Sequence, residues 1–216
     1  RLAATPVPAS LQAAWRHAAA GPARWLAEAA LAVRSSAPQE DSQQASFAGI
    51  HRSCLNVRGE AAAWAAVVEV WCSPWTPAAV AYRRRMGMAH AEAAMAVLVM
   101  PLVPAQASGI AFTQDPVTGR ADRLVIHANW GLGESLVGGE SAGDEFVLAI
   151  DGQDHPARLV QARTADKPHA REPEPSGGTR LAALPPARRQ AACLSEPQAE
   201  RLAVLLHQAA LALDWE

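Results

Sequence analysis

The spacing of apolar residues along the chain predicts helices in four places. These segments lie before Val33 and at Glu60 to Val70, Pro77 to Met86 and Glu196 to Leu211. Pro22, directly after Gly21, should divide the first of them into two helices, because proline breaks a helix interior. Thr76 and Ser195 precede two of the other segments and are of the residue types that cap helix N-termini.

Runs rich in Val, Ile, Leu and Phe predict strands later in the chain. They span Ala94 to Val103, Gly109 to Thr113, Arg123 to Ala128 and Glu145 to Ile150. Prolines and glycines separate them, so we expect one mostly antiparallel sheet. Leu31 to Val33 predicts an earlier short strand that leads into a polar loop at residues 34–49. Pro168 to Gly178 combines prolines and glycines with charged residues, which predicts a flexible exposed loop.

The layout therefore indicates an α+β fold with two parts. Residues 1–90 would form an N-terminal helical part that carries the polar loop, and residues 91–216 a C-terminal sheet lobe.

Composition narrows the function classes. Half of the 216 residues are hydrophobic and 19% are charged, which excludes a disordered chain. The net charge of -2 provides no basic surface for nucleic acid or for an anionic membrane, and the longest apolar run is too short to span a bilayer. Widely separated cysteines exclude a disulfide scaffold and a zinc site, and they fit a cytoplasmic protein; they are Cys54, Cys72 and Cys193.

The polar loop offers an oxyanion site. Arg34 follows a buried-looking strand and stands beside serines, and guanidinium groups match phosphate oxygens with two parallel hydrogen bonds. Gly49 would let backbone N–H groups approach a ligand closely. On spacing alone, a turn in which Arg34 pairs with Glu40 or Asp41 is the favoured interpretation.

Several short motifs shift the preference from this turn toward the oxyanion site. They are Val33 to Ala37, Glu40 with Asp41, Ala45 to Gly49, Leu55 to Val57, Ala81 to Arg85, Val103 to Ala105, Ser108 to Thr113, Asp115 to Gly119 and Asn129 to Glu134. In this order they resemble the signature of the nucleotide-binding domain of phosphoenolpyruvate synthase and pyruvate phosphate dikinase, which rifampicin phosphotransferase shares.

The resemblance implies an ATP-grasp fold, whose two lobes close on ATP and Mg²⁺. Arg34 would contact the phosphates, and Gly49 and Ser53 would lie in the loop above them, Ser53 where the family often has threonine. Met100 stands where the family often has glutamine, so it would offer adenine apolar packing but no amide. Glu134 would lie on the ligand side of the sheet, or would serve only as an acidic residue at a helix N-terminus.

The resemblance also implies a metal pair at the C-terminal end. Asp214 and Glu216 match the family's Asp-x-Glu step, where both carboxylates hold Mg²⁺, so with Arg34 they would be the catalytic residues. A slip of two residues would instead match Asp214 to the family glutamate and leave Ala212 opposite the aspartate. A solvated acidic terminus is the remaining alternative.

Two further cationic segments carry weaker signals. Lys167 lies in a stretch that resembles a family segment, although a surface position is the expectation for a lysine. Arg83, Arg84 and Arg85 end a helix, where cations suit the helix dipole, and one of them could reach a phosphate.

The family's upstream Gly-Lys segment and its later Gln-Ser-Arg strand are not in the sequence, so we expect an incomplete domain, truncated at both ends, that alone binds ATP at about millimolar affinity. The resemblance implies an ATP-dependent phosphotransferase that passes a phosphoryl group to a carrier histidine and on to pyruvate or a similar acceptor. Its partners would be a swivelling phosphohistidine domain and a pyruvate-binding domain. A non-catalytic remnant with a binding role, or a rifampicin-type antibiotic phosphotransferase, are the alternatives.

Overall fold

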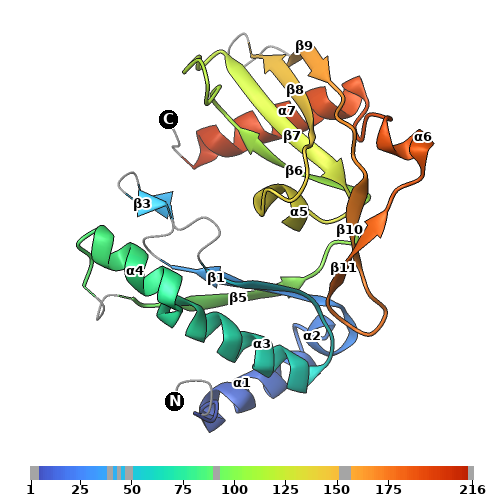
Figure 1. Ribbon diagram of the computed structural model, residues 1–216. Coiled ribbons are helices and arrows are strands. Elements are labelled where there is room, and N and C mark those ends of the chain that lie inside the picture. Colours follow the sequence, from blue (N-terminus) through green and yellow to red (C-terminus); the bar gives the residue numbers. More distant parts are fainter. Residues whose placement is uncertain are drawn as a thin grey trace. The chain divides into compact units, whose positions relative to one another are not determined.

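The chain folds into two compact units, made of Arg1–Val103 with Pro173–Thr179 and of Pro104–Glu172 with Arg180–Glu216. This computed structural model describes residues 5–37, 41–42, 45–46, 51–89, 93–150 and 157–213. Helices and antiparallel sheets occur together, so the expected α+β class is confirmed (Figure 1). No helix within these ranges is long and apolar enough to cross a membrane.

A three-stranded antiparallel sheet forms the centre of the first unit. Its strands run in the order β4 (Ser53–Val57), β1 (Leu31–Ser36) and β5 (Ala96–Pro101). One face packs against α3 (Glu60–Cys72), where Leu31 and Val33 of β1 are buried together with Val67 and Val70 of the helix. Because side chains alternate along a strand, Ala32 and Arg34 of β1 face away from α3.

The remaining elements of the first unit are α1 (Ala9–Ala20), α2 (Trp25–Glu28), the short ladder of β2 (Asp41–Ser42) with β3 (Ala45–Ser46), the 3₁₀ turn η2 (Ser73–Trp75) and α4 (Pro77–Arg85). The helices among them follow the sequence signals, whereas the ladder of β2 and β3 lies in the segment predicted to be a loop. The predicted break at Gly21 and Pro22 separates α1 from α2. The Thr76 hydroxyl accepts a hydrogen bond from the Ala79 amide at 3.3 Å, which confirms the predicted cap of α4.

The prediction of one sheet for residues 94–150 is wrong at its first strand. β5 pairs with β1 along its whole length, from Leu31 opposite Pro101 to Ser36 opposite Ala96. The physical reason is packing against α3, since Val97 and Val99 join the same cluster on α3 as the β1 residues. The polar loop also begins later than expected, because β1 continues through Ser36 and places Arg34 within a strand.

A four-stranded antiparallel sheet forms the centre of the second unit. Its order is β6 (Ala107–Phe112), β7 (Arg123–Trp130), β8 (Asp144–Ala149) and β9 (Arg158–Arg163). The long helix α7 (Glu196–Ala212) covers one face, and its Ala199 and Ala203 are buried against Ile126, Phe146 and Leu148. The short helices are α5 (Glu134–Val137) and α6 (Pro186–Arg189).

The segment predicted to be a flexible loop is mostly a hairpin. β10 (His169–Pro173) pairs with β11 (Thr179–Ala183), and Ala170 of β10 is buried. The prolines and glycines lie at the strand end and in the turn, where they suit hairpin geometry. Composition indicated the turn correctly and missed the strands on either side of it.

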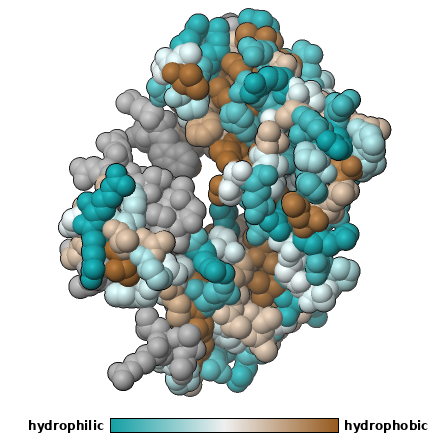
Figure 2. All heavy atoms as spheres, viewed as in Figure 1, coloured by the Kyte–Doolittle hydropathy of each residue, from teal (hydrophilic) through white to brown (hydrophobic). Residues whose placement is uncertain are grey.

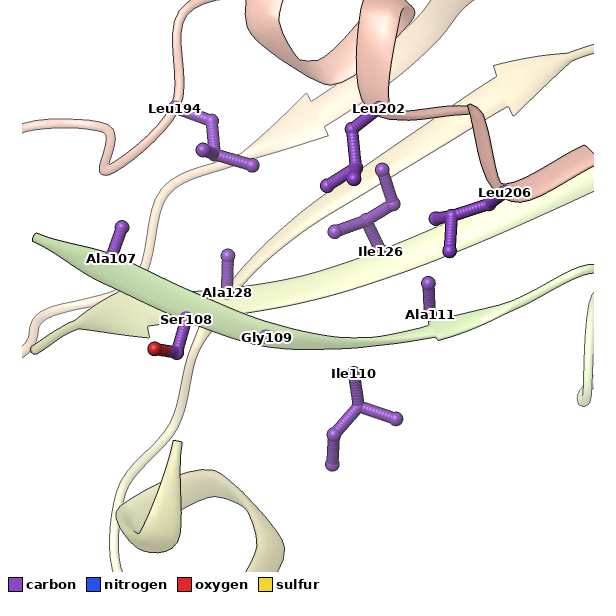
Figure 3. A pocket seen from close by; sticks show the side chains of 10 residues that line it. All are labelled: Ala107, Ser108, Gly109, Ile110, Ala111, Ile126, Ala128, Leu194, Leu202 and Leu206. Atoms are coloured by element: carbon purple, nitrogen blue, oxygen red, sulfur yellow. The ribbon is translucent and has the colours of Figure 1, made fainter. Parts of the chain in front are cut away.

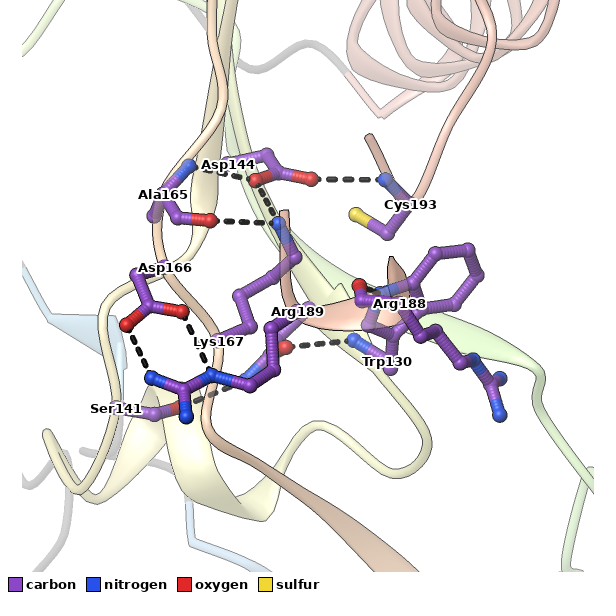
Figure 4. A network of polar contacts seen from close by, with 10 residues as sticks. Trp130, Ser141, Asp144, Ala165, Asp166, Lys167, Arg188, Arg189 and Cys193 are labelled. Atoms are coloured by element: carbon purple, nitrogen blue, oxygen red, sulfur yellow. Dashed lines mark hydrogen bonds and ion pairs between the residues drawn. The ribbon is translucent and has the colours of Figure 1, made fainter. Parts of the chain in front are cut away.

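A buried ion pair holds three segments of the second unit together. Asp144 of β8 and Lys167 are both fully buried, and the Lys167 ammonium donates to Asp144 and to the Ala165 carbonyl oxygen (Figure 4). The other Asp144 oxygen accepts from the Cys193 amide at 2.8 Å. The expectation of a surface position for Lys167 is therefore wrong, because the carboxylate compensates its charge in the interior.

The same network makes Cys193 an unreactive thiol. Burial, and then the hydrogen bond with Asp144, raise the pKa of Cys193 to about 12. The thiolate form that attacks electrophiles is therefore scarce at neutral pH, so Cys193 is a structural residue.

We predict that Lys167→Met lowers the free energy of unfolding by about 3–5 kcal/mol, because it leaves the Asp144 charge buried without a counter-charge. The double variant Asp144→Asn with Lys167→Met should lose clearly less than the single variant. Urea denaturation followed by circular dichroism measures both. A Lys167→Met variant as stable as the parent protein would show that the ion pair does not contribute to the stability of the fold.

Candidate functional site

One row of side chains crosses the open face of the first sheet, away from α3. Arg34 on β1 lies directly opposite Ser53 of β4 and opposite Leu98 of β5. All three side chains are exposed. Since directly paired residues project from the same face of a sheet, the structure brings together the arginine and the hydroxyl that the sequence proposed for phosphate.

Arg34 offers its guanidinium to solvent. Among the residues whose side chains the structure describes, which exclude residues 38–50, no carboxylate lies at ion-pair distance from it and no hydrogen bond engages its side chain. Arg52, which stands next to Ser53, behaves differently, because it donates to Glu69 of α3 at 2.6 Å. The two arginines therefore differ in their partners, and Arg34 is the one available to an anionic ligand.

Met100 extends the open face along β5. It pairs with Ala32 of β1, two residues before Arg34, and is half-buried. Leu98, at half exposure, lies on the same face between Met100 and Ala96, the first residue of the strand. Sequence reasoning missed Leu98, although its spacing of two residues from Met100 could have identified it. The face thus offers a cation and a hydroxyl beside an apolar strip.

Several sequence-predicted residues fall outside the described residues. These are Gly49, Asp214 and Glu216, together with Glu40 and the side chain of Asp41 as the alternative partners of Arg34. Among the residues that are described, no group of three or more His, Cys, Asp or Glu side chains could hold a metal ion.

Glu134 lies in the second unit and has a structural partner. It begins α5, and its carboxylate lies 3.8 Å from the Arg171 guanidinium, which also donates to Glu140 at 2.5 Å. Arg171 belongs to β10, so these contacts join the turn before α5 to the hairpin. Of the two alternatives for Glu134, its ion pair with Arg171 favours the structural one, an acidic residue at a helix N-terminus, and a contact with a ligand stays a prediction.

The turn that precedes Glu134 depends on a glycine. Gly131 has a φ of +75°, and a Cβ there would meet the Arg171 carbonyl oxygen at 2.2 Å. The close approach allows the Leu132 amide to donate to that oxygen at 2.7 Å. Gly133 in the same turn has no such need, because its added Cβ would make an ordinary contact at 3.5 Å with Ser108.

We therefore predict that Gly131→Ala destabilises the protein by about 2 kcal/mol or more, from the left-handed conformation and the clash with backbone. Gly133→Ala is the matched control and should change stability by about 0.5 kcal/mol or less. Thermal unfolding of both variants tests the pair. Equal effects at the two positions would contradict the role of the close approach.

The motif Asp115 to Gly119 is a self-contained turn between β6 and β7. The Asp115 carboxylate accepts hydrogen bonds from the Thr118 hydroxyl at 2.5 Å and from the Val117 amide at 2.8 Å. The hydrogen bond from the Thr118 hydroxyl has the largest effect on the pKa of Asp115, and together with the bond from the Val117 amide it lowers that pKa. The motif is explained by turn chemistry, since its polar groups bind one another.

A cavity of about 240 Å³ lies between β6, β7 and α7 in the second unit. Figure 3 shows small residues of the strands on one side, with Leu202 and Leu206 of α7 facing them. Ser108 lies on the other face of β6, where its hydroxyl donates to the Gly131 carbonyl oxygen at 2.7 Å. Without polar groups to orient a ligand, this cavity is unsuited to a nucleotide.

Figure 2 shows hydrophobic residues scattered among hydrophilic ones on the face in view. The most exposed of them in the described ranges are Val117, Val103 and Val137. Such scattering is ordinary for a protein surface.

The helix-end arginines divide into two kinds. Arg84 and Arg85 are exposed, whereas Arg83 is buried with its guanidinium 5.4 Å from the centre of the Trp75 ring. The aromatic face compensates part of the buried charge. A phosphate contact is accordingly open only to the exposed pair.

Comparison with known proteins identifies the family of this chain. The family described as pyruvate phosphate dikinase, AMP/ATP-binding domain, matches residues 1–210. The prodigiosin synthesizing transferase PigC of Serratia marcescens is 40% identical over 203 residues, 94% of this chain and 22% of that protein. A rifampicin phosphotransferase of Streptomyces sp is 39% identical over 202 residues, again 94% and 22%. The phosphoenolpyruvate synthase of Aeropyrum pernix is 46% identical over 122 residues, 56% and 15%. The chain thus spans about a fifth of the length of these relatives.

Proposed function

Since the chain belongs to the pyruvate phosphate dikinase AMP/ATP-binding domain family, we propose that it is the ATP-binding part of a phosphotransferase. In this proposal a phosphoryl group passes from ATP to a carrier histidine on a swivelling domain, and then to pyruvate or a similar acceptor. The carrier and acceptor domains belong to the longer protein, as the lengths of the relatives suggest.

The observation that carries the proposal is the row of Ser53, Arg34 and Leu98. Among the residues whose side chains the structure describes, which exclude 38–50, this guanidinium has no partner, and it stands beside a hydroxyl on an open sheet face. Two parallel N–H groups of arginine match two oxygens of a phosphate, and a serine hydroxyl can donate to a third. This arrangement supports a phosphate contact in a way that an ion-paired surface arginine such as Arg52 does not.

The apolar strip beside Arg34 suits the nucleobase. Leu98 and Met100 present carbon and sulfur atoms on the same face, and these pack against an aromatic ring without hydrogen bonding to it. In this proposal, affinity comes mainly from the phosphates, and discrimination between bases by this strip is weak.

The metal pair remains a proposal on the sequence pattern. Asp214 and Glu216 would hold Mg²⁺ between their carboxylates and the phosphates of ATP, oxygen ligands that this ion prefers. When bound, the ion would neutralise charge that develops on the transferring phosphoryl group. Arg34 would contribute to the same neutralisation from the protein side.

The acceptor is the point on which the relatives differ. Their names refer to phosphoenolpyruvate synthesis, to rifampicin and to prodigiosin. We favour pyruvate or a similar acceptor, and a panel of pyruvate and rifampicin with the whole gene product decides between them. Phosphorylation of rifampicin alone would replace our proposal by the antibiotic-modifying alternative.

We predict that Arg34→Ala raises the dissociation constant for Mg-ATP by about 10- to 100-fold, because hydrogen bonds to charged groups contribute about 1.5–3 kcal/mol. Ser53→Ala should weaken binding less, by about 3- to 10-fold, since a neutral hydroxyl is the weaker partner. Nuclear magnetic resonance titration measures constants in the millimolar range directly.

Arg52→Ala is the matched control. It removes an exposed arginine next to Ser53 whose partner is Glu69, and it should leave ATP binding unchanged. If Arg34→Ala and Arg52→Ala weaken binding equally, the effect is general surface charge, and the phosphate site is not at Arg34.

For the metal pair, we predict that Asp214→Ala abolishes phosphoryl transfer in the whole gene product while reducing nucleotide binding less, because the metal charge matters most in the transition state. Glu216→Ala should behave alike. Steady-state kinetics tests both variants. A silent Glu216→Ala beside an inactive Asp214→Ala would support the slipped register, and two silent variants would remove the metal assignment.

A further inference from the structure

Asn56, near the end of β4, has an unusual backbone. Its φ is +55°, the only positive value at a non-glycine residue in the described ranges, and it is completely buried. The left-handed conformation costs about 1–2 kcal/mol for a residue with a side chain, and asparagine tolerates it better than most. The buried amide must therefore make interactions that offset this cost.

The Asn56 side chain uses both of its N–H donors on one short loop. Nδ2 donates to the Glu174 carbonyl oxygen at 2.6 Å and to the Gly178 carbonyl oxygen at 2.7 Å. The Gly178 amide donates back to the Asn56 carbonyl oxygen at 3.1 Å. These residues lie in Pro173–Thr179, the turn between β10 and β11, which belongs to the first unit together with β4. Asn56 thus fastens this turn to the outer edge of β4.

Asn56 lies in a β-bulge of β4. Leu31 of β1 faces Val57, but Val33 faces Cys54, so Leu55 and Asn56 together stand opposite the single residue Ala32. A bulge of this kind shifts the pairing of every residue beyond it by one. Beyond this bulge, Ser53 faces Arg34.

Without the bulge, the pairing that begins at Leu31 and Val57 would place Cys54, not Ser53, opposite Arg34. A shift of one residue also exchanges the two faces of a strand, so Ser53 would turn toward α3 and Cys54 toward the open face. The composition of the open face therefore depends on the bulge.

We propose that Asn56 is a positioning residue that fixes the bulge of β4 and thereby holds Ser53 beside Arg34. The two hydrogen bonds to the turn at 173–179 favour the left-handed backbone that the bulge requires. This inference rests on the proposed function for its effect on nucleotide binding, while its structural part can be measured without any nucleotide.

The reactivity of the Cys54 thiol measures the register in which β4 pairs with β1. In the native register it is half-buried on the α3 side, where its thiol lies 3.8 Å from a Glu69 oxygen. In the shifted register it would reach the open face and react faster with a maleimide. Mass spectrometry of the labelled protein gives the Cys54 rate relative to half-buried Cys72 of α3, so general loosening of the unit cancels.

We expect Asn56→Ala and Asn56→Gly to raise the Cys54 to Cys72 labelling ratio at least 10-fold. Asn56→Gly also loses both hydrogen bonds to the turn, but it can adopt either backbone conformation without strain, so it provides a folded variant if Asn56→Ala does not fold. Asn56→Asp should have the largest effect, because a carboxylate would face two carbonyl oxygens. Asn129→Ala, which removes another buried asparagine amide bonded to Ser141, is the control and should leave the ratio unchanged.

Nucleotide binding supplies the second readout. Asn56→Gly should raise the Mg-ATP dissociation constant as much as Ser53→Ala, and the double variant should add nothing further, because both changes remove the same hydroxyl from the site. Additive losses would contradict positioning. Labelling ratios at the parental value in both Asn56→Ala and Asn56→Gly would overturn the inference. A raised ratio with no change in ATP binding by Arg34→Ala would instead reject the proposed function and leave the register role intact.

Discussion

The alternation of side chains along β1 is the constraint on which the first unit depends. Leu31 and Val33 are buried on α3, and this burial fixes which way the next residue points. Arg34 can then only project from the opposite face, where Ser53 and Leu98 flank it. The free energy that positions Arg34 therefore comes from the burial of its apolar neighbours in the strand, and not from any interaction of the arginine itself.

The same alternation explains what sequence reasoning achieved and where it failed. A strand at Leu31 to Val33, the cap at Thr76 and the amphipathic helix after Ser195 are local patterns, and the structure confirms them. The pairing of β5 with β1 is a contact between residues 60 to 70 positions apart, and no local pattern encodes it. The sequence therefore proposed Arg34 and Ser53, through the family resemblance, without the register that brings them together.

Buried polar groups were the hardest features to predict. Lys167 is of a residue type usually found at the surface, and only the Asp144 carboxylate 23 positions earlier makes its burial possible. Asn56 belonged to a recognised motif but had no assigned role until the turn at 173–179 was seen beside it. In both cases the determining partner lies far along the chain. Glycines at turns were easier to interpret, since their function follows from backbone geometry.

The central claim is that the open face around Arg34 binds the phosphates of a nucleotide. The most direct measurement is a backbone amide shift map of the chain, recorded during titration with ATP and, separately, with AMP. The account predicts that shifts at Arg34, Ser53 and Leu98 are larger with ATP than with AMP at equal saturation, because the added phosphates lie beside these residues. Shift changes confined to residues whose side chains face α3 would contradict this claim. Shift changes at Arg34 that are equal for the two nucleotides would contradict it too.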